Sequence, residues 1–80
     1  MDIYAKLKEM IGDKLRKNVD IDSITPDTEL EDLGLDSLDT AELLINIETE
    51  FDLPEITQEE MLSIETVKDV KELIERKRNS

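Results

Sequence analysis

The chain has 80 residues, of which 22 are acidic and 10 are basic, and it contains no cysteine and no histidine, so its net charge is −12. This composition excludes a disulfide framework, a zinc site with cysteine or histidine ligands, a thiol nucleophile and the commonest general base. A chain this acidic is not expected to bind nucleic acid, and without a long apolar run it is not expected to span a membrane.

Acidic and basic residues are separated along the sequence. Residues 18–67 contain sixteen acids and no base, whereas the end segments 1–17 and 68–80 each have a net charge of +2. We expect a single domain over residues 1–80, monomeric and cytoplasmic, whose partners present basic surfaces. Crowding so many acids without a local base should also raise the pKa of several carboxyl groups in the folded state.

The first part of the chain is predicted to be a helix followed by a long connection. A helix ending near Lys17 is indicated by apolar residues that recur every four positions, at Ile3, Leu7, Ile11 and Leu15. Residues 18–35 fit no helical period, and Pro26 and Gly34 are typical of turns.

Three further helices are predicted by their start signals. Asp36 is placed to cap a second helix that runs to Phe51, and Thr57 with Glu60 is typical of a capping box for a short third helix. Thr66 caps the last helix, whose buried stripe consists of Val67, Val70, Leu73 and Ile74. The predicted fold class is all-α: a small four-helix bundle with a long first loop and a short third helix.

The residue types leave little room for catalysis, and we predict that the chain is not an enzyme. A serine nucleophile needs an adjacent base, and there is neither a histidine nor a lysine between residues 17 and 68. An EF-hand loop starting at Asp27 fails, because Asp32 stands where glycine is needed and Leu38 where glutamate is needed. We therefore predict no dedicated metal site, beyond weak divalent binding by clustered carboxylates.

The chain resembles the acyl carrier protein family in one string and the positions after it: Gly34-Leu35-Asp36-Ser37-Leu38-Asp39, then Glu42-Leu43 and Glu48-Thr49-Glu50-Phe51. The resemblance extends over the whole chain in helix order, length and acidity. It implies that a phosphopantetheinyl transferase attaches 4′-phosphopantetheine, taken from coenzyme A, to Ser37. The arm would then carry acyl intermediates as thioesters, for type II fatty-acid synthesis or a related pathway. Without the resemblance, Ser37 is an ordinary first-turn residue after an Asp cap.

The resemblance also implies a docking surface and an acyl pocket. Members of the family bind basic patches on the transferase and on enzymes that build or transfer acyl chains. The candidate partner-binding residues are Asp36, Leu38, Asp39, Ala41, Glu42, Ile45 and Glu48; the alternative is a solvated acidic face. The candidates for lining the acyl pocket are Leu44, Ile47, Leu62, Ile64 and Val67; the alternative is that they only form the core.

Several departures from the family pattern leave the pathway open. Thr49 stands where the family often has an acid, and Asn46 where many relatives have a small apolar residue. The segment 28–34 is one residue shorter, and the segment 51–67 one residue longer, than in the commonest fatty-acid pattern. A dedicated carrier for polyketide, lipid-modifying or aminoacyl transfer is the first alternative. An acidic interaction protein that is never modified is the second, and a phosphopantetheine adduct on Ser37 separates the two classes.

Overall fold

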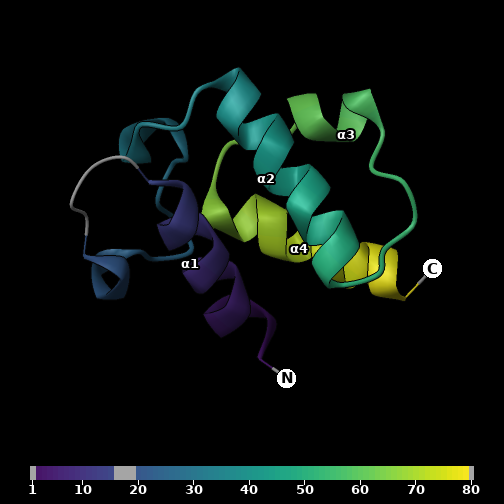
Figure 1. Ribbon diagram of the computed structural model, residues 1–80, viewed down its shortest axis with the longest axis horizontal. Coiled ribbons are helices and arrows are strands. Elements are labelled where there is room, and N and C mark those ends of the chain that lie inside the picture. Colours follow the sequence, from purple (N-terminus) through teal and green to yellow (C-terminus); the bar gives the residue numbers. More distant parts are fainter. Residues whose placement is uncertain (1, 16–19, 80) are drawn as a thin grey trace.

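The computed structural model describes residues 2–15 and 20–79, and these residues form four α-helices and no strand (Figure 1). The helices are α1 (Ile3–Lys14), α2 (Ser37–Glu50), α3 (Gln58–Leu62) and α4 (Val67–Arg78). The predicted all-α bundle with a long first connection and a short third helix is confirmed. No helix within the described ranges has the length and apolar character needed to cross a membrane.

Helices α2, α3 and α4 each begin with a reciprocal capping box. At α2, Oδ1 of Asp36 accepts a hydrogen bond of 2.8 Å from the N–H of Asp39, and the carboxylate of Asp39 accepts one from the N–H of Asp36. The same arrangement begins the next two helices, in the pairs Thr57–Glu60 and Thr66–Asp69. Each box satisfies backbone N–H groups that the first turn leaves free, so the start of each helix is fixed by residues within three positions of it.

Helix α1 ends at Lys14, and the N–H of Leu15 donates to the carbonyl of Gly12 at 3.3 Å. The predicted end near Lys17 lies outside the described residues. Gly12 lets the following connection approach α1 closely, because a Cβ atom on this residue would lie 2.6 Å from Cδ1 of Ile21. A side chain at this position would therefore require the end of the Ile21 side chain to move.

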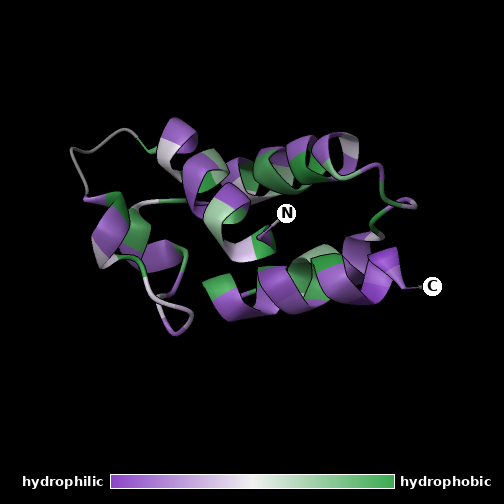
Figure 2. Cartoon of the chain, turned by 90° about the horizontal axis from the view of Figure 1, so that it is seen from below, coloured by the Kyte–Doolittle hydropathy of each residue, from purple (hydrophilic) through white to green (hydrophobic). Residues whose placement is uncertain are grey.

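The hydrophobic core lies between α1, α2 and α4. Nine side chains from these helices are almost completely buried: Leu7, Ile11, Leu43, Leu44, Ile47, Val67, Val70, Leu73 and Ile74. In Figure 2, α4 is mainly hydrophilic with short hydrophobic stretches, as expected for a helix that buries one face. The apolar stripe predicted for α4 is confirmed.

The long connection is more ordered than the sequence predicts. It contains two short 3₁₀ helices, η1 (Ile21–Ser23) and η2 (Glu31–Leu33), and Gly34 ends the second of these with a φ of 85°. The hydroxyl of Tyr4 on α1 donates to the carbonyl of Ile24 at 2.8 Å. The connection closes one side of the core with the buried side chains of Ile24, Leu30, Leu33 and Leu35.

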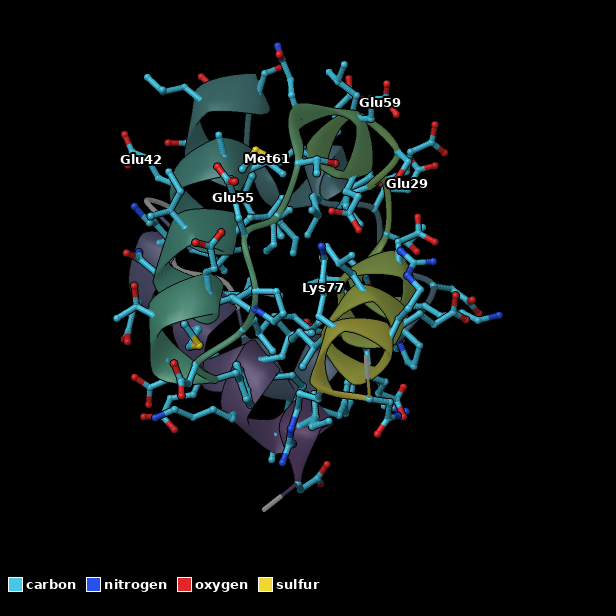
Figure 3. The ribbon with its side chains drawn as sticks, turned by 90° about the vertical axis from the view of Figure 1, so that its right-hand side faces the viewer. Glu29, Glu42, Glu55, Glu59, Met61 and Lys77 are labelled. Carbon is cyan, nitrogen blue, oxygen red and sulfur yellow. The ribbon has the colours of Figure 1, made fainter. Side chains whose placement is uncertain are left out.

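Helix α3 lies at the edge of this core: it buries no residue completely, and its partly buried Met61 packs against the core. It is attached by Lys77 of α4, whose Nζ lies 2.8 Å from Oε1 of Glu60 and donates to the carbonyl of Glu55 at 2.9 Å. Figure 3 shows Lys77 reaching from α4 toward the segment that joins α2 and α3. A single lysine thus connects α4, the α2–α3 connection and the first turn of α3.

Lysines of α1 and α4 reach into the acidic middle of the chain. Lys6 pairs with Glu50 at 2.9 Å and Lys14 pairs with Glu42 at 2.8 Å, in addition to the pair made by Lys77. The acidic segment contains no local base, and the tertiary fold supplies cations from the two end helices instead.

Hydrogen bonds lower the pKa of two carboxyl groups in the folded chain. The hydrogen bond from Lys77 and the N–H of Thr57 lower the pKa of Glu60 to about 2. Burial opposes a low pKa for Asp69, but hydrogen bonds from the backbone of Thr66 and Glu65 outweigh it and lower that pKa. The predicted increase is wrong for Glu60, because donors within hydrogen-bond distance outweigh the effect of crowding, whereas Asp69 lies outside the acidic segment to which the prediction applies.

Candidate functional site

A cavity of about 910 Å³ opens beside the start of α2, a volume typical of small-molecule sites. Its walls come from the long connection, the first turns of α2, and α3 with the residues after it. The lining residues are Glu29, Leu30, Glu31, Gly34, Leu35, Asp36, Ser37, Thr40, Ala41, Gln58, Met61, Leu62, Ile64 and Glu65.

Ser37 is the first residue of α2 and lies on the wall of this cavity. Its side chain is exposed, and its hydroxyl makes no hydrogen bond to any described residue. The lining residues include no lysine to take its proton. Ser37 is thus open to an incoming reagent, but the cavity supplies neither a histidine nor a lysine, the usual bases that activate a serine.

The rim of the cavity is held by backbone hydrogen bonds between distant segments. The N–H of Leu30 donates to the carbonyl of Glu65 at 2.9 Å, and the N–H of Val67 donates to the carbonyl of Thr28 at 3.0 Å. Glu29 forms an isolated antiparallel bridge with the residue that follows Glu65. The two ends of the cavity wall are therefore joined, and the acidic side chains of Glu29 and Glu65 lie on the same rim.

Four of the predicted partner-binding residues are exposed or half-buried at the start of α2 and along it. Asp36 is exposed and caps α2, and Ala41 is half-buried on the cavity wall. Leu38 is 67% exposed and Ile45 is 52% exposed, although both are large apolar side chains. An exposed leucine beside the site is a contact that an approaching protein can bury.

The three predicted partner-binding acids of α2 each make a contact inside the molecule. Asp39 was expected on the outer face, but it is only 9% exposed because its carboxylate turns back to cap the helix. Glu42 forms the ion pair with Lys14, and Glu48 accepts a hydrogen bond of 3.0 Å from the N–H of Ile56. The acidic face of α2 is thus partly engaged before any partner arrives.

The five predicted pocket residues fall into two groups. Leu62 and Ile64 line the cavity beside Ser37, and Leu62 is 77% exposed, so it forms part of the rim. Leu44, Ile47 and Val67 are fully buried in the closed core and do not line the cavity. The predicted role of all five in holding an acyl chain stays a prediction.

Sequence reasoning missed the acidic residues of the cavity rim. Glu29, Glu31 and Glu65 line the cavity, but the first two are far from the third in the sequence, and only the fold brings them together. One local signal was available: an apolar Leu30 between two glutamates indicates that the leucine is buried and that the glutamates on either side are exposed.

Comparisons with known proteins agree with one another. Residues 5–74 match the family described as the phosphopantetheine attachment site. The acyl carrier protein of Solidesulfovibrio magneticus is 40% identical over 79 residues, which are 98% of this chain and 97% of that protein. That of Bdellovibrio bacteriovorus is 41% identical over 78 residues, 96% of each. The crystal structure of an acyl carrier protein from Thermotoga maritima has a TM-score of 0.80 and 32% identity, and the match covers 94% of this chain and 85% of that one.

Proposed function

The chain belongs to the phosphopantetheine-attachment family of acyl carrier proteins, and we propose that Ser37 is the residue that bears its covalent 4′-phosphopantetheine. The arm supplies the thiol that this cysteine-free chain lacks, and acyl groups are carried on that thiol as thioesters. The assignment to Ser37 rests on one observation: its hydroxyl is exposed and unbonded at the mouth of the cavity.

The surroundings of Ser37 fit a site that another enzyme modifies. A helix N-terminus favours a phosphate group, but the carboxylates of Asp36 and Asp39 already accept N–H groups of this turn and repel an anion. Access therefore explains the position of Ser37 better than anion binding does. The base that deprotonates the hydroxyl is supplied by the phosphopantetheinyl transferase, so the chain itself is a carrier and not an enzyme.

We assign the carrier to type II fatty-acid synthesis or a closely related pathway. The support is the string Asp36-Ser37-Leu38-Asp39, together with apolar side chains at and behind the cavity. In this proposal a short acyl chain lies against Leu62 and Ile64. A longer chain additionally separates side chains of the closed core, which are Leu44, Ile47 and Val67.

The partners of this proposal are enzymes with basic patches, which meet the carrier one after another. The predicted contacts are the exposed residues around Ser37 and along α2. We further propose that the carrier is a cytoplasmic monomer, since coenzyme A must be available as the donor of the arm.

Intact-mass spectrometry tests the attachment site. We expect the parent chain, incubated with coenzyme A and a phosphopantetheinyl transferase, to gain one phosphopantetheine group, and Ser37→Ala to gain none while keeping its helical circular dichroism. Ser23→Ala is the matched control, because it removes another exposed serine hydroxyl, one that donates to the carbonyl of Asp20 at 2.6 Å. An adduct on Ser37→Ala would contradict the assignment.

A further inference from the structure

We propose that Lys14 of α1 weakens the docking of partner enzymes on α2, because it occupies the carboxylate of Glu42, which a partner's lysine or arginine would otherwise bind alone. This inference rests on the proposed carrier function, in which basic partners bind along α2. Partners still dock on that helix, but they compete there with a cation of the chain itself. Lys14 is thus a positioning residue that acts through Glu42.

The ion pair between Lys14 and Glu42 joins the end of α1 to the first half of α2. Nζ of Lys14 donates a hydrogen bond of 2.8 Å to Oε2 of Glu42. The lysine side chain is 24% exposed, whereas the glutamate side chain is 50% exposed. Figure 3 shows Glu42 on the outer side of α2. A partner can therefore reach the carboxylate from solvent while the lysine holds it from α1.

An ion pair attracts a third charge less strongly than a single carboxylate does. The fields of Glu42 and Lys14 partly cancel at distances larger than their separation, so an approaching cation meets a dipole instead of a full negative charge. On contact, the partner's cation replaces the lysine and does not add a pair. The exchange gains only the difference between two exposed ion pairs, which is small. Lys14 therefore slows the approach of a basic partner and reduces what its contact gains.

Lys14 has space into which it can move when a partner displaces it. It lines a hollow of about 260 Å³ between α1 and α2, together with Met10, Asp13, Leu43 and Asn46. Asp13 and Asn46 are exposed, so this hollow is open to solvent. The lysine can leave Glu42 by rotating its side chain, and the two helices need not separate. The pair is therefore one that a partner can exchange.

The chain contains a matched ion pair farther from Ser37. Nζ of Lys6 on α1 lies 2.9 Å from Oε1 of Glu50 on α2, and the two side chains are 29% and 47% exposed. Because an α-helix rises about 1.5 Å per residue, Glu42 lies about 8 Å and Glu50 about 20 Å along α2 from Ser37. A transferase that must reach Ser37 comes closer to Glu42. Lys6 is therefore the control for an ion pair of the same kind between the same helices.

The experiment measures the kinetics with which one phosphopantetheinyl transferase modifies the parent chain and the variants Lys14→Gln, Lys6→Gln and Lys71→Gln. Each variant removes one positive charge, and Lys71 pairs with Glu75 within α4. At low salt we expect Lys14→Gln to raise kcat/KM about two- to fourfold through a lower KM, and each control to change it less than about 1.5-fold. High salt should remove the difference, because the charges are exposed. Circular dichroism confirms that each variant is folded.

A second background tests whether Lys14 acts through Glu42. In Glu42→Gln the carboxylate is absent, so the additional change Lys14→Gln should raise kcat/KM no more than Lys6→Gln does. A rise as large in this background as in the parent chain would overturn the inference, because Lys14 would then repel the partner directly.

A kcat/KM of Lys14→Gln equal to or below that of the parent would overturn the inference and leave the carrier function intact, because Lys14 would then have no effect or contact the partner favourably. Equal rises in all three lysine variants would also overturn it, because net charge alone would explain them. A parent chain that accepts no phosphopantetheine would instead overturn the proposed function, and the inference about Lys14 with it.

Discussion

Helices α3 and α4 begin in the same way but are held in place by different interactions. Each starts with a threonine whose hydroxyl accepts from the third N–H of the helix, and each returns a carboxylate to the N-cap backbone. Helix α4 then buries Val67, Val70, Leu73 and Ile74, whereas α3 buries no residue completely. The same start signal therefore precedes one helix that belongs to the core and one that lies at its edge.

The position at which a helix begins and the strength of its attachment to the bundle therefore have different causes. The capping boxes fix the first turns, but apolar burial supplies most of the free energy that attaches a helix to a bundle. Helix α3 instead has only the partly buried Met61 packed against the core, together with the contacts of Lys77 with Glu60 and Glu55. Because α3 forms a wall of the cavity beside Ser37, we expect this wall to open locally while the core stays closed.

The largest expected difference in stability is between a leucine-to-alanine substitution in α4 and the same substitution in α3. Leu73→Ala in α4 should lower the free energy of unfolding by about 2–5 kcal/mol, because it leaves a cavity in the closed core. Leu62→Ala in α3 should change it by no more than about 0.5 kcal/mol, because Leu62 is mostly exposed. Urea unfolding followed by circular dichroism measures both, and similar losses would remove the contrast between the helices.

Removing the lysine that holds α3 should have a smaller and more local effect. Lys77→Met should cost about 1–2 kcal/mol, because it removes charge-assisted hydrogen bonds between partly buried groups. Hydrogen exchange should accelerate mainly in the amides of α3. Lys71→Met is the control, because Lys71 makes an exposed pair with Glu75 one turn away on the same helix. Uniform acceleration across α3 and α4 would show that Lys77 supports the whole bundle.

Removing the threonine cap of each helix should have the next largest effect, and this effect should be global for α4 and local for α3. Thr66→Ala should lower the free energy of global unfolding by about 1 kcal/mol, because α4 must form for the core to close. Thr57→Ala removes the equivalent cap, but we expect its effect mainly in the local exchange of α3 amides. A global loss for Thr57→Ala as large as that for Thr66→Ala would contradict the local character of α3.

The smallest effect concerns pH. The pKa of Glu60 falls from its usual 4.5 to about 2 in the folded chain, chiefly through the hydrogen bond from Lys77. A folded pKa below the unfolded one means that the contribution of Glu60 is complete above pH 4.5 and is lost as the pH falls toward 2. Asp69 acts in the same direction. Melting curves should therefore show stability declining over this acidic window, and NMR titration should show a higher pKa for Glu60 in Lys77→Met.

A rise in melting temperature on acidification through that window would restore the view that charge repulsion dominates. Such repulsion is what the sequence alone indicates, since residues 18–67 contain no base. The fold weakens it by bringing Lys6, Lys14 and Lys77 to carboxylates in that segment. Pairs of this kind join different helices, and no local pattern in the sequence reveals them.

The features that could be predicted from the sequence are those formed by residues close together along the chain. The caps by Asp36, Thr57 and Thr66 involve residues three positions apart, so a short string of sequence contains all of the information. The apolar stripe of α4 is equally local. The position of Ser37 at the start of α2 was predicted for the same reason, since the residue before it is the cap.

The parts that were not predicted depend on tertiary contacts. Glu29 and Glu65 share a cavity rim because backbone bonds join two segments that are distant in the sequence. The burial of Asp39 follows from the way its carboxylate closes the capping box, which residue type alone does not reveal. Leu62 has the apolar character of a core residue, but α3 lies at the edge of the core and leaves it exposed.

The most direct test of the account is to locate the phosphopantetheine group within the modified chain. Trypsin yields a single peptide over residues 18–68, because no lysine or arginine interrupts it, and this peptide contains Ser23, Ser37 and Ser63. Fragmentation of the peptide by tandem mass spectrometry distinguishes the three serines. The account predicts that every fragment carrying the added mass includes Ser37, whereas the added mass on Ser23 or Ser63, or its absence from the modified sample, would contradict it.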